Sequence, residues 1–148
     1  MPLPGSQLGT PGFRVHLATI GPAGEVSDVE RITVDPRADD ELNPIFTPTG
    51  DGIVFQRRYG WTPPQAGGPE PTVDTLHLLR LADRQVLDLG VESRNGDGVW
   101  FSVAPDGASV TAQLIKERED WLVDLDTGTA TRTALDSMSG VTWQRRAP

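Results

Sequence analysis

The sequence contains no cysteine. It therefore forms no disulfide, offers no thiolate nucleophile and has no cysteine ligand for zinc. Apolar runs are short, and none approaches the roughly 18 residues that suggest a membrane-spanning helix. The first twelve residues, MPLPGSQLGTPG, lack the basic region and the apolar core of a secretory signal. We therefore expect no membrane contact and a cytoplasmic location by default, or a periplasmic or secreted one if the chain was cut from a longer precursor.

Positive charge is also scarce. The chain has 13 Lys and Arg against 21 Asp and Glu, which gives a formal net charge of −8. Such a surface repels a phosphate backbone, so a nucleic-acid partner is not expected. Glycine and proline are plentiful, at 16 and 13 residues. Both weaken long helices, because glycine costs backbone entropy and proline removes a hydrogen-bond donor. Composition therefore favours an all-β fold of short strands and turns.

One stretch occurs twice along the chain. Residues 43–55 read NPIFTPTGDGIVF, and residues 98–112 read GVWFSVAPDGASVTA. In each copy a short apolar run meets Pro, one further residue and Gly, and a second apolar run follows, which is the pattern of a β-hairpin. Repetition of this kind is typical of repeat architectures.

The corner residues of the two copies have a structural explanation. We assign Pro48, Gly50, Pro105, Asp106 and Gly107 to tight turns. Proline fixes φ near −65°, aspartate can accept a bond from its own downstream amide, and glycine takes the positive φ of the corner. Asp106 is therefore interpreted as a turn residue rather than as a ligand or a catalyst.

The copied corners resemble the repeats of TolB-like and WD-type β-propellers. Ala104-Pro105-Asp106-Gly107 followed by Val110 is the closer match, and Thr47-Pro48-Thr49-Gly50 differs because Thr49 stands in place of Asp. The resemblance implies antiparallel four-stranded blades, with strands A to D in each. It also implies a partial propeller of about two full blades with part-blades at both ends, and a binding or scaffolding role without catalytic residues.

The chain then divides into a flexible lead-in and one repeat domain. The lead-in is 1–12 and the domain is 13–148. Within the domain we predict a C–D hairpin at 13–34, with strands 13–20 and 26–34, a blade at 43–90 with a loop insert at 59–73, a blade at 98–135 and a lone A strand at 140–144.

Packing between the blades is expected to bury Phe46, Val103 and Trp143. A partial ring leaves apolar blade faces uncovered at both ends. Three arrangements would cover them: a homodimer that completes a six-bladed ring, a larger propeller of which this is a segment, or an open, capped array. A β-sandwich outside the propeller class is a further alternative.

The insert is the stretch most open to a functional interpretation. Tyr59 and Trp61 lie at its start, beside Arg57 and Arg58 at the end of the preceding strand. Arginine and aromatic side chains exposed on a loop are typical of recognition surfaces. The alternative is that Tyr59 and Trp61 fold back and cover a blade edge. We expect the ligand at a blade end formed by the loops 35–43, 57–73 and 92–98.

Other candidate sites have simpler explanations. His16 and His77 are two isolated histidines, expected on a polar face or half-buried rather than on a metal. The acidic run at 35–41 lacks the spacing of a calcium loop and is expected to be solvated. No G-x-S-x-G elbow is present. We therefore predict a non-catalytic binding module without metal or cofactor, with a protein or a second copy of itself as partner. The alternative is the propeller portion of a prolyl-oligopeptidase-like serine hydrolase whose catalytic domain lies outside this chain.

Overall fold

The computed structural model describes residues 12–60, 72–94, 96 and 98–133. All regular structure in these residues is β, so none of them forms a helix suited to crossing a membrane. The strands are β1 (His16–Ile20), β2 (Val26–Arg31), β3 (Asp40–Phe46), β4 (Gly52–Tyr59), β5 (Val73–Arg80), β6 (Val86–Ser93), β7 (Trp100–Val103), β8 (Ser109–Leu114), β9 (Glu119–Asp124) and β10 (Ala130–Thr133).

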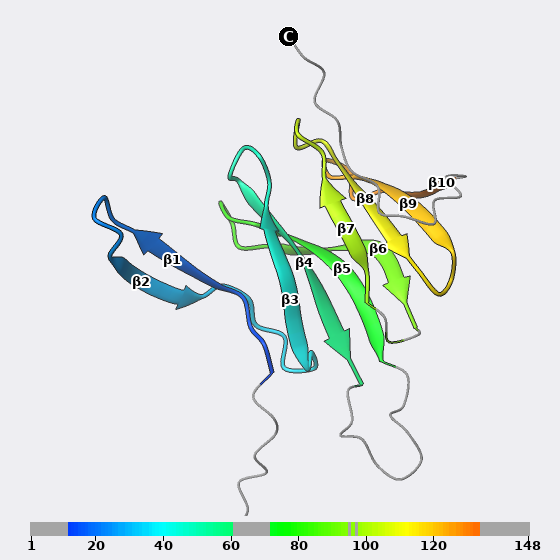
Figure 1. Ribbon diagram of the computed structural model, residues 1–148, viewed down its shortest axis with the longest axis horizontal. Helices are drawn as coiled ribbons and strands as arrows, with labels where there is room; N and C mark the ends of the chain where they lie inside the picture. The colour runs from blue at the N-terminus through cyan, green and yellow to red at the C-terminus, as the bar shows by residue number, and fades with distance from the viewer. Residues whose placement is uncertain (1–11, 61–71, 95, 97, 134–148) are drawn as a thin grey trace, which may run out of the picture.

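The strands form a hairpin and two four-stranded antiparallel sheets. The first sheet has the order β3-β4-β5-β6 and the second the order β7-β8-β9-β10, so neighbours in each sheet are consecutive in the chain. The β1–β2 hairpin, the first sheet and the second sheet follow one another from left to right in Figure 1. The predictions of an all-β fold and of antiparallel four-stranded sheets are confirmed.

Several predicted strand limits are wrong. β1 begins at His16 instead of Phe13, because the carbonyl of Phe13 accepts a hydrogen bond from the amide of Glu41 next to the first sheet. The Phe13 side chain is 71% exposed. β2 ends at Arg31 rather than at residue 34. The insert is shorter than expected, since Tyr59 ends β4 and Val73 begins β5. The predicted strand at 140–144, which includes Trp143, lies outside the described residues.

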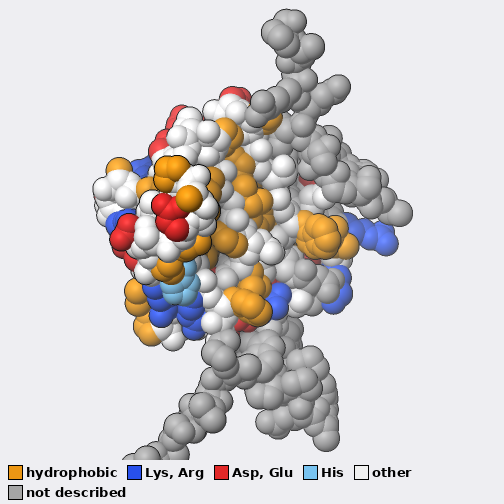
Figure 2. All heavy atoms as spheres, turned by 60° about the vertical axis from the view of Figure 1, so that its left-hand side comes forward, with side chains coloured by type: hydrophobic (Ala, Val, Ile, Leu, Met, Phe, Trp, Pro, Cys, Tyr) orange, Lys and Arg blue, Asp and Glu red, His pale blue; other side chains and the backbone are white. Residues whose placement is uncertain are grey.

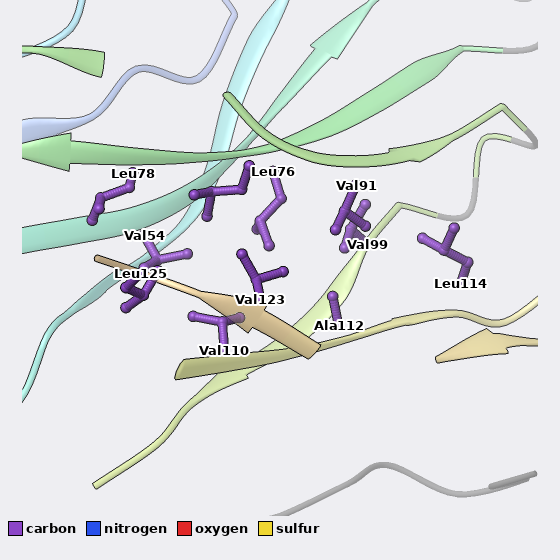
Figure 3. Packing of buried hydrophobic residues seen from close by; sticks show 11 residues of the cluster. Val54, Leu76, Leu78, Val91, Val99, Val110, Ala112, Leu114, Val123 and Leu125 are labelled. Carbon is purple, nitrogen blue, oxygen red and sulfur yellow. The ribbon is translucent and has the colours of Figure 1, made fainter. Parts of the chain in front are cut away.

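The first sheet is buried on both of its faces. Successive side chains of a strand point to opposite faces, and β4 is apolar at consecutive positions. Val54 points toward the second sheet, where Leu76, Leu78, Val110 and other small aliphatic residues form one core (Figure 3). On the other face Ile53, Phe55 and Leu79 form a second core with Val15 and Ile32 of the N-terminal segment.

The side chains predicted to be buried on the edge strands β3 and β7 are exposed to different extents. Phe46 is 53% exposed, so the expectation that it belongs to the core is wrong, whereas Val103 is partly buried and packs against the core between the sheets. The physical reason is that β3 and β7 are the first strands of their sheets, and in the part of the chain that the structure describes each has a strand neighbour on one side only. Burial is nearly complete on the inner strands β4, β5 and β8, whereas β9 alternates between buried and exposed positions.

The two corners have the same hydrogen bonds and lie side by side. The amides of Gly50 and Gly107 each donate to the carbonyl three residues earlier, at 2.9 Å, and both glycines have positive φ, 75° and 73°. Asp106 accepts a bond from the amide of Ala108 at 2.9 Å. A Cβ placed on Gly107 would lie 3.5 Å from Cδ of Pro48. Equivalent points of the two sheets are thus neighbours in space.

Candidate functional site, a groove between the two edge strands

A groove of about 630 Å³ runs between β3 and β7. It lies where the two sheets meet, at the end opposite the Pro-x-Gly corners. Most of its lining is apolar, and Trp100 is 64% exposed beside it. The lining residues are Leu42, Asn43, Pro44, Ile45, Gln56, Arg58, Gly98, Val99, Trp100 and Phe101.

The wall on the first sheet is shaped by an irregularity in β3. The pairing of β3 with β4 shifts between Leu42 and Ile45, and Asn43 has a positive φ of 53°. Asparagine tolerates this conformation better than most residues. Pro44 follows, and a proline is compatible with a strand only at an edge or a bulge. The bulge therefore places an irregular, partly apolar edge against the groove.

The floor of the groove is polar, and its charged side chains pair with one another. The amide of Val99 donates to Oε1 of Gln56 at 3.1 Å, and Nε2 of Gln56 donates to Oδ1 of Asp74 at 2.7 Å. Nε of Arg58 donates to the same carboxylate oxygen at 2.8 Å. Gly98 has a φ of 78°, and a Cβ there would lie 3.2 Å from Gln56. These hydrogen bonds connect Val99, the residue just before the second sheet begins, to the first sheet.

The second sheet has a comparable glutamine–aspartate pair. Nε2 of Gln113 in β8 donates to Oδ1 of Asp120 in β9 at 2.7 Å. Gln56 and Gln113 stand at the same offset in the chain as the two corners. The repeat therefore extends from the turns to a buried polar contact between the second and third strands of each sheet.

The structure separates the residues predicted to bind a ligand. Arg58 lines the groove with a side chain that is 23% exposed. Arg57 points to the opposite face and is buried, because neighbours on a strand alternate. Tyr59 is half-buried on that same face and its hydroxyl donates to Asp35 at 3.2 Å. Trp61 lies outside the described residues.

Arg57 is the centre of a buried charge cluster. Its Nε donates to Oε1 of Glu41 at 3.3 Å, and its Nη1 lies 3.6 Å from Oδ2 of Asp35. The expectation of a solvated acidic run is wrong for these two carboxylates, because both are buried as counter-ions of Arg57. The hydrogen bonds from Arg37 hold the pKa of Asp35 well below its ordinary value. Removal from water raises the pKa of Tyr59.

The histidines occupy dissimilar places. His16 is exposed and its Nδ1 lies 3.2 Å from the carbonyl of Arg14. His77 is buried, and its Nε2 is 2.7 Å from the hydroxyl of Thr75. Neither contact is the histidine–serine bond of a hydrolase triad. Within the described residues no group of three His, Asp or Glu side chains could hold a metal ion.

Sequence reasoning missed the groove, although a signal for it was present. The dipeptide Asn43-Pro44 interrupts a strand pattern, and such an interruption is typical of a bulge in an edge strand. Trp100 and Phe101 are consecutive aromatics at the start of the facing strand. The two segments lie side by side only because the two sheets pack together, and no local sequence pattern reveals that packing.

No protein-family model matches the chain, and no curated protein matches it. Among solved structures the chain is similar to hydrazine synthase of Kuenenia stuttgartiensis, at 16% sequence identity and a TM-score of 0.45. That similarity covers 70% of this chain and 31% of the other, so this chain spans about a third of that protein. A likeness this distant carries no information on function.

Proposed function

We propose that the chain is a non-catalytic binding module of β-propeller type, in which the two sheets are successive blades. Its ligand, an extended segment of a protein partner, lies in the groove between β3 and β7. The observation that carries the proposal is the groove itself, which has the volume of a ligand site and exposes Trp100 at its side.

The composition of the groove favours a ligand without strong charge. Its one arginine is already bonded to the buried carboxylate of Asp74. A charged ligand group entering the apolar part would lose water without gaining a free counter-ion. Among the described strands β3 and β7 each have a sheet partner on one side only, and extended peptides commonly add to such edges. Exposed aromatic side chains are the usual anchors of such interfaces.

Replacing Trp100 by alanine is expected to weaken peptide binding by roughly tenfold or more, because an aromatic anchor is removed. A displayed library of short peptides selected on the wild-type chain supplies the ligands, and their affinities are compared between variants. Phe13→Ala is the matched control, since it removes an exposed aromatic side chain that does not line the groove. A library that yields no binder, or binders equally tight for Trp100→Ala, contradicts the proposal.

Self-association through the N-terminal hairpin is the second part of the proposal. Within the described ranges β1 has a strand neighbour on one side only, and Ile20, Val26 and Val29 are exposed. Figure 2 brings this hairpin forward and shows hydrophobic side chains on it and over the middle of the face. Apolar surface of this kind is commonly covered by a partner. A solution mass of two chains would support a dimer, and a monomer at all concentrations would oppose it.

A further inference from the structure

His77 has a buried nitrogen without a partner. The side chain is 5% exposed, and its ring stacks on Phe55 with centroids 5.7 Å apart. Nε2 contacts Thr75, but within the described part of the chain Nδ1 makes no hydrogen bond. An unsatisfied buried polar group costs roughly 1–3 kcal/mol. The site therefore suits a neutral ring, because burial disfavours the charged form of the imidazole.

Charged groups approach His77 from every neighbouring element. Arg57 of β4 lies over the same Phe55 ring, with its guanidinium carbon 5.3 Å from the centroid. Asp88 of β6 is the cross-strand partner of His77. Asp35 comes from the segment after β2, and Glu41 of β3 lies beside Arg57. The exposed Arg37 and the Tyr59 hydroxyl complete the set through Asp35.

The balance of these groups opposes a second positive charge. Burial first, and the positive charge of Arg57 second, lower the pKa of His77 from 6.5 to about 4. The carboxylates of Asp88 and Asp35, together with the backbone of Leu87, act in the opposite direction without outweighing them. His77 is thus neutral in the folded protein near pH 7, and its protonation is disfavoured by the structure around it.

The same face of the first sheet holds the N-terminal segment in place. Val15 and Ile32 pack on Ile53, Phe55 and Leu79. The hydroxyl of Thr33 and the amide of Val15 both donate to the carboxylate of Glu41. Beyond these anchors every residue of β2 is exposed. The core between the two sheets lies on the opposite face and contains none of these anchors.

We propose that protonation of His77 releases the β1–β2 hairpin, with its anchoring residues, from the first sheet, while the two sheets stay together. The molecule then carries an acid-sensitive arm. Its departure uncovers the apolar face formed by Ile53, Phe55 and Leu79, so that an apolar surface becomes available for a partner in acid and is closed near pH 7.

The direction of the pH effect, and the pH range in which it occurs, follow from the linkage between protonation of His77 and release of the hairpin. In the released state His77 is open to water, so burial no longer opposes the proton and its pKa rises toward the ordinary 6.5. Because the attached state binds the proton less well, attachment is strongest above pH 6.5 and weakens as the pH falls toward 4. From pH 7.5 to 5 the equilibrium constant for release rises roughly 30-fold. The depressed pKa of Asp35 acts only below its ordinary value of 3.8, so pH 5 isolates the histidine.

Hydrogen exchange followed by mass spectrometry tests this on the whole chain. With intrinsic exchange rates divided out, amides of residues 13–35 are expected to lose about 30-fold protection between pH 7.5 and 5, while β8 and β9 keep theirs. His77→Phe keeps the stack and His77→Gln keeps a polar group, and neither titrates, so both are expected to remove the pH dependence. His16→Gln, at the exposed histidine, is the matched control and is expected to behave as the wild type.

Equal pH dependence in the His77 variants would overturn the proposal, and so would a loss of protection spread evenly over both sheets. If neither His77 variant folds, a measurement on the wild-type protein alone still tests the proposal. The His77 ring is then titrated by NMR alongside the amide protection of residues 13–35. A ring that titrates at its ordinary 6.5 in the attached state contradicts the proposal, and one that titrates well below it, in step with the loss of protection, supports it.

Discussion

Replacing Arg57 by methionine is expected to lower the free energy of unfolding by roughly 3–5 kcal/mol. Methionine keeps much of the apolar stem but removes the charge that two buried carboxylates share. The side chain of Glu41 is fully buried and that of Asp35 nearly so. Without Arg57 the buried Glu41 loses its ion-pair partner beneath the N-terminal segment, whereas Asp35 keeps the contact with Arg37. Urea unfolding followed by tryptophan fluorescence measures the change.

Arg84→Met is the matched control for this prediction. Arg84 pairs with Glu30, but both side chains are about half exposed. An exposed ion pair contributes roughly 0–1 kcal/mol, so this variant is expected to unfold nearly as the wild type. If Arg57→Met cost no more than Arg84→Met, the cluster would be unimportant for stability, and the interpretation of Arg57 as a structural residue would be wrong.

Replacing Leu76 by alanine is expected to cost roughly 2–5 kcal/mol. Leu76 is fully buried and points from β5 into the core between the two sheets. Alanine leaves a cavity there, because two packed sheets cannot close over the lost atoms without moving apart. The spread in the expected value reflects how far the neighbouring side chains relax.

Leu122→Ala is the control for the core prediction. Leu122 lies on β9, in the same kind of third strand, but is 38% exposed. Its replacement is expected to cost less than about 1 kcal/mol. Denaturant midpoints with unchanged slopes would identify both effects as changes in stability. Similar costs for the two leucines would mean that the inter-sheet core does not hold the molecule together.

The sequence predicted the sheets because their signals are local. Alternating apolar residues on either side of Pro48-Thr49-Gly50 and Pro105-Asp106-Gly107 fix a hairpin without reference to the rest of the chain. The same pattern placed Arg57 and Arg58 at the end of a strand. It did not show that alternation sends Arg57 into a charge cluster and Arg58 into a groove.

The parts that the sequence did not predict depend on partners far apart in the chain. Gln56 reaches Asp74 within its sheet and Val99 beyond it, and Glu41 meets Arg57 across a strand pair. The acidic composition of residues 35–41, DPRADDE, indicates a solvated loop. Only the structure shows that a buried arginine lies beside two of its carboxylates. Phe46 was predicted to be buried because its place in the repeat is one where blades pack together, although its place on an edge strand leaves it exposed.

The arrangement of the two sheets as equivalent, neighbouring units is the claim on which the groove, the propeller proposal and the repeat all depend. It is tested most directly by a nuclear Overhauser effect between the Hδ protons of Pro48 and the Hα protons of Gly107. We expect this effect to be observed, since a Cβ at Gly107 would lie within van der Waals contact of Pro48. Its absence, in spectra that do show the effect between Ala104 Hα and Pro105 Hδ, would contradict the account.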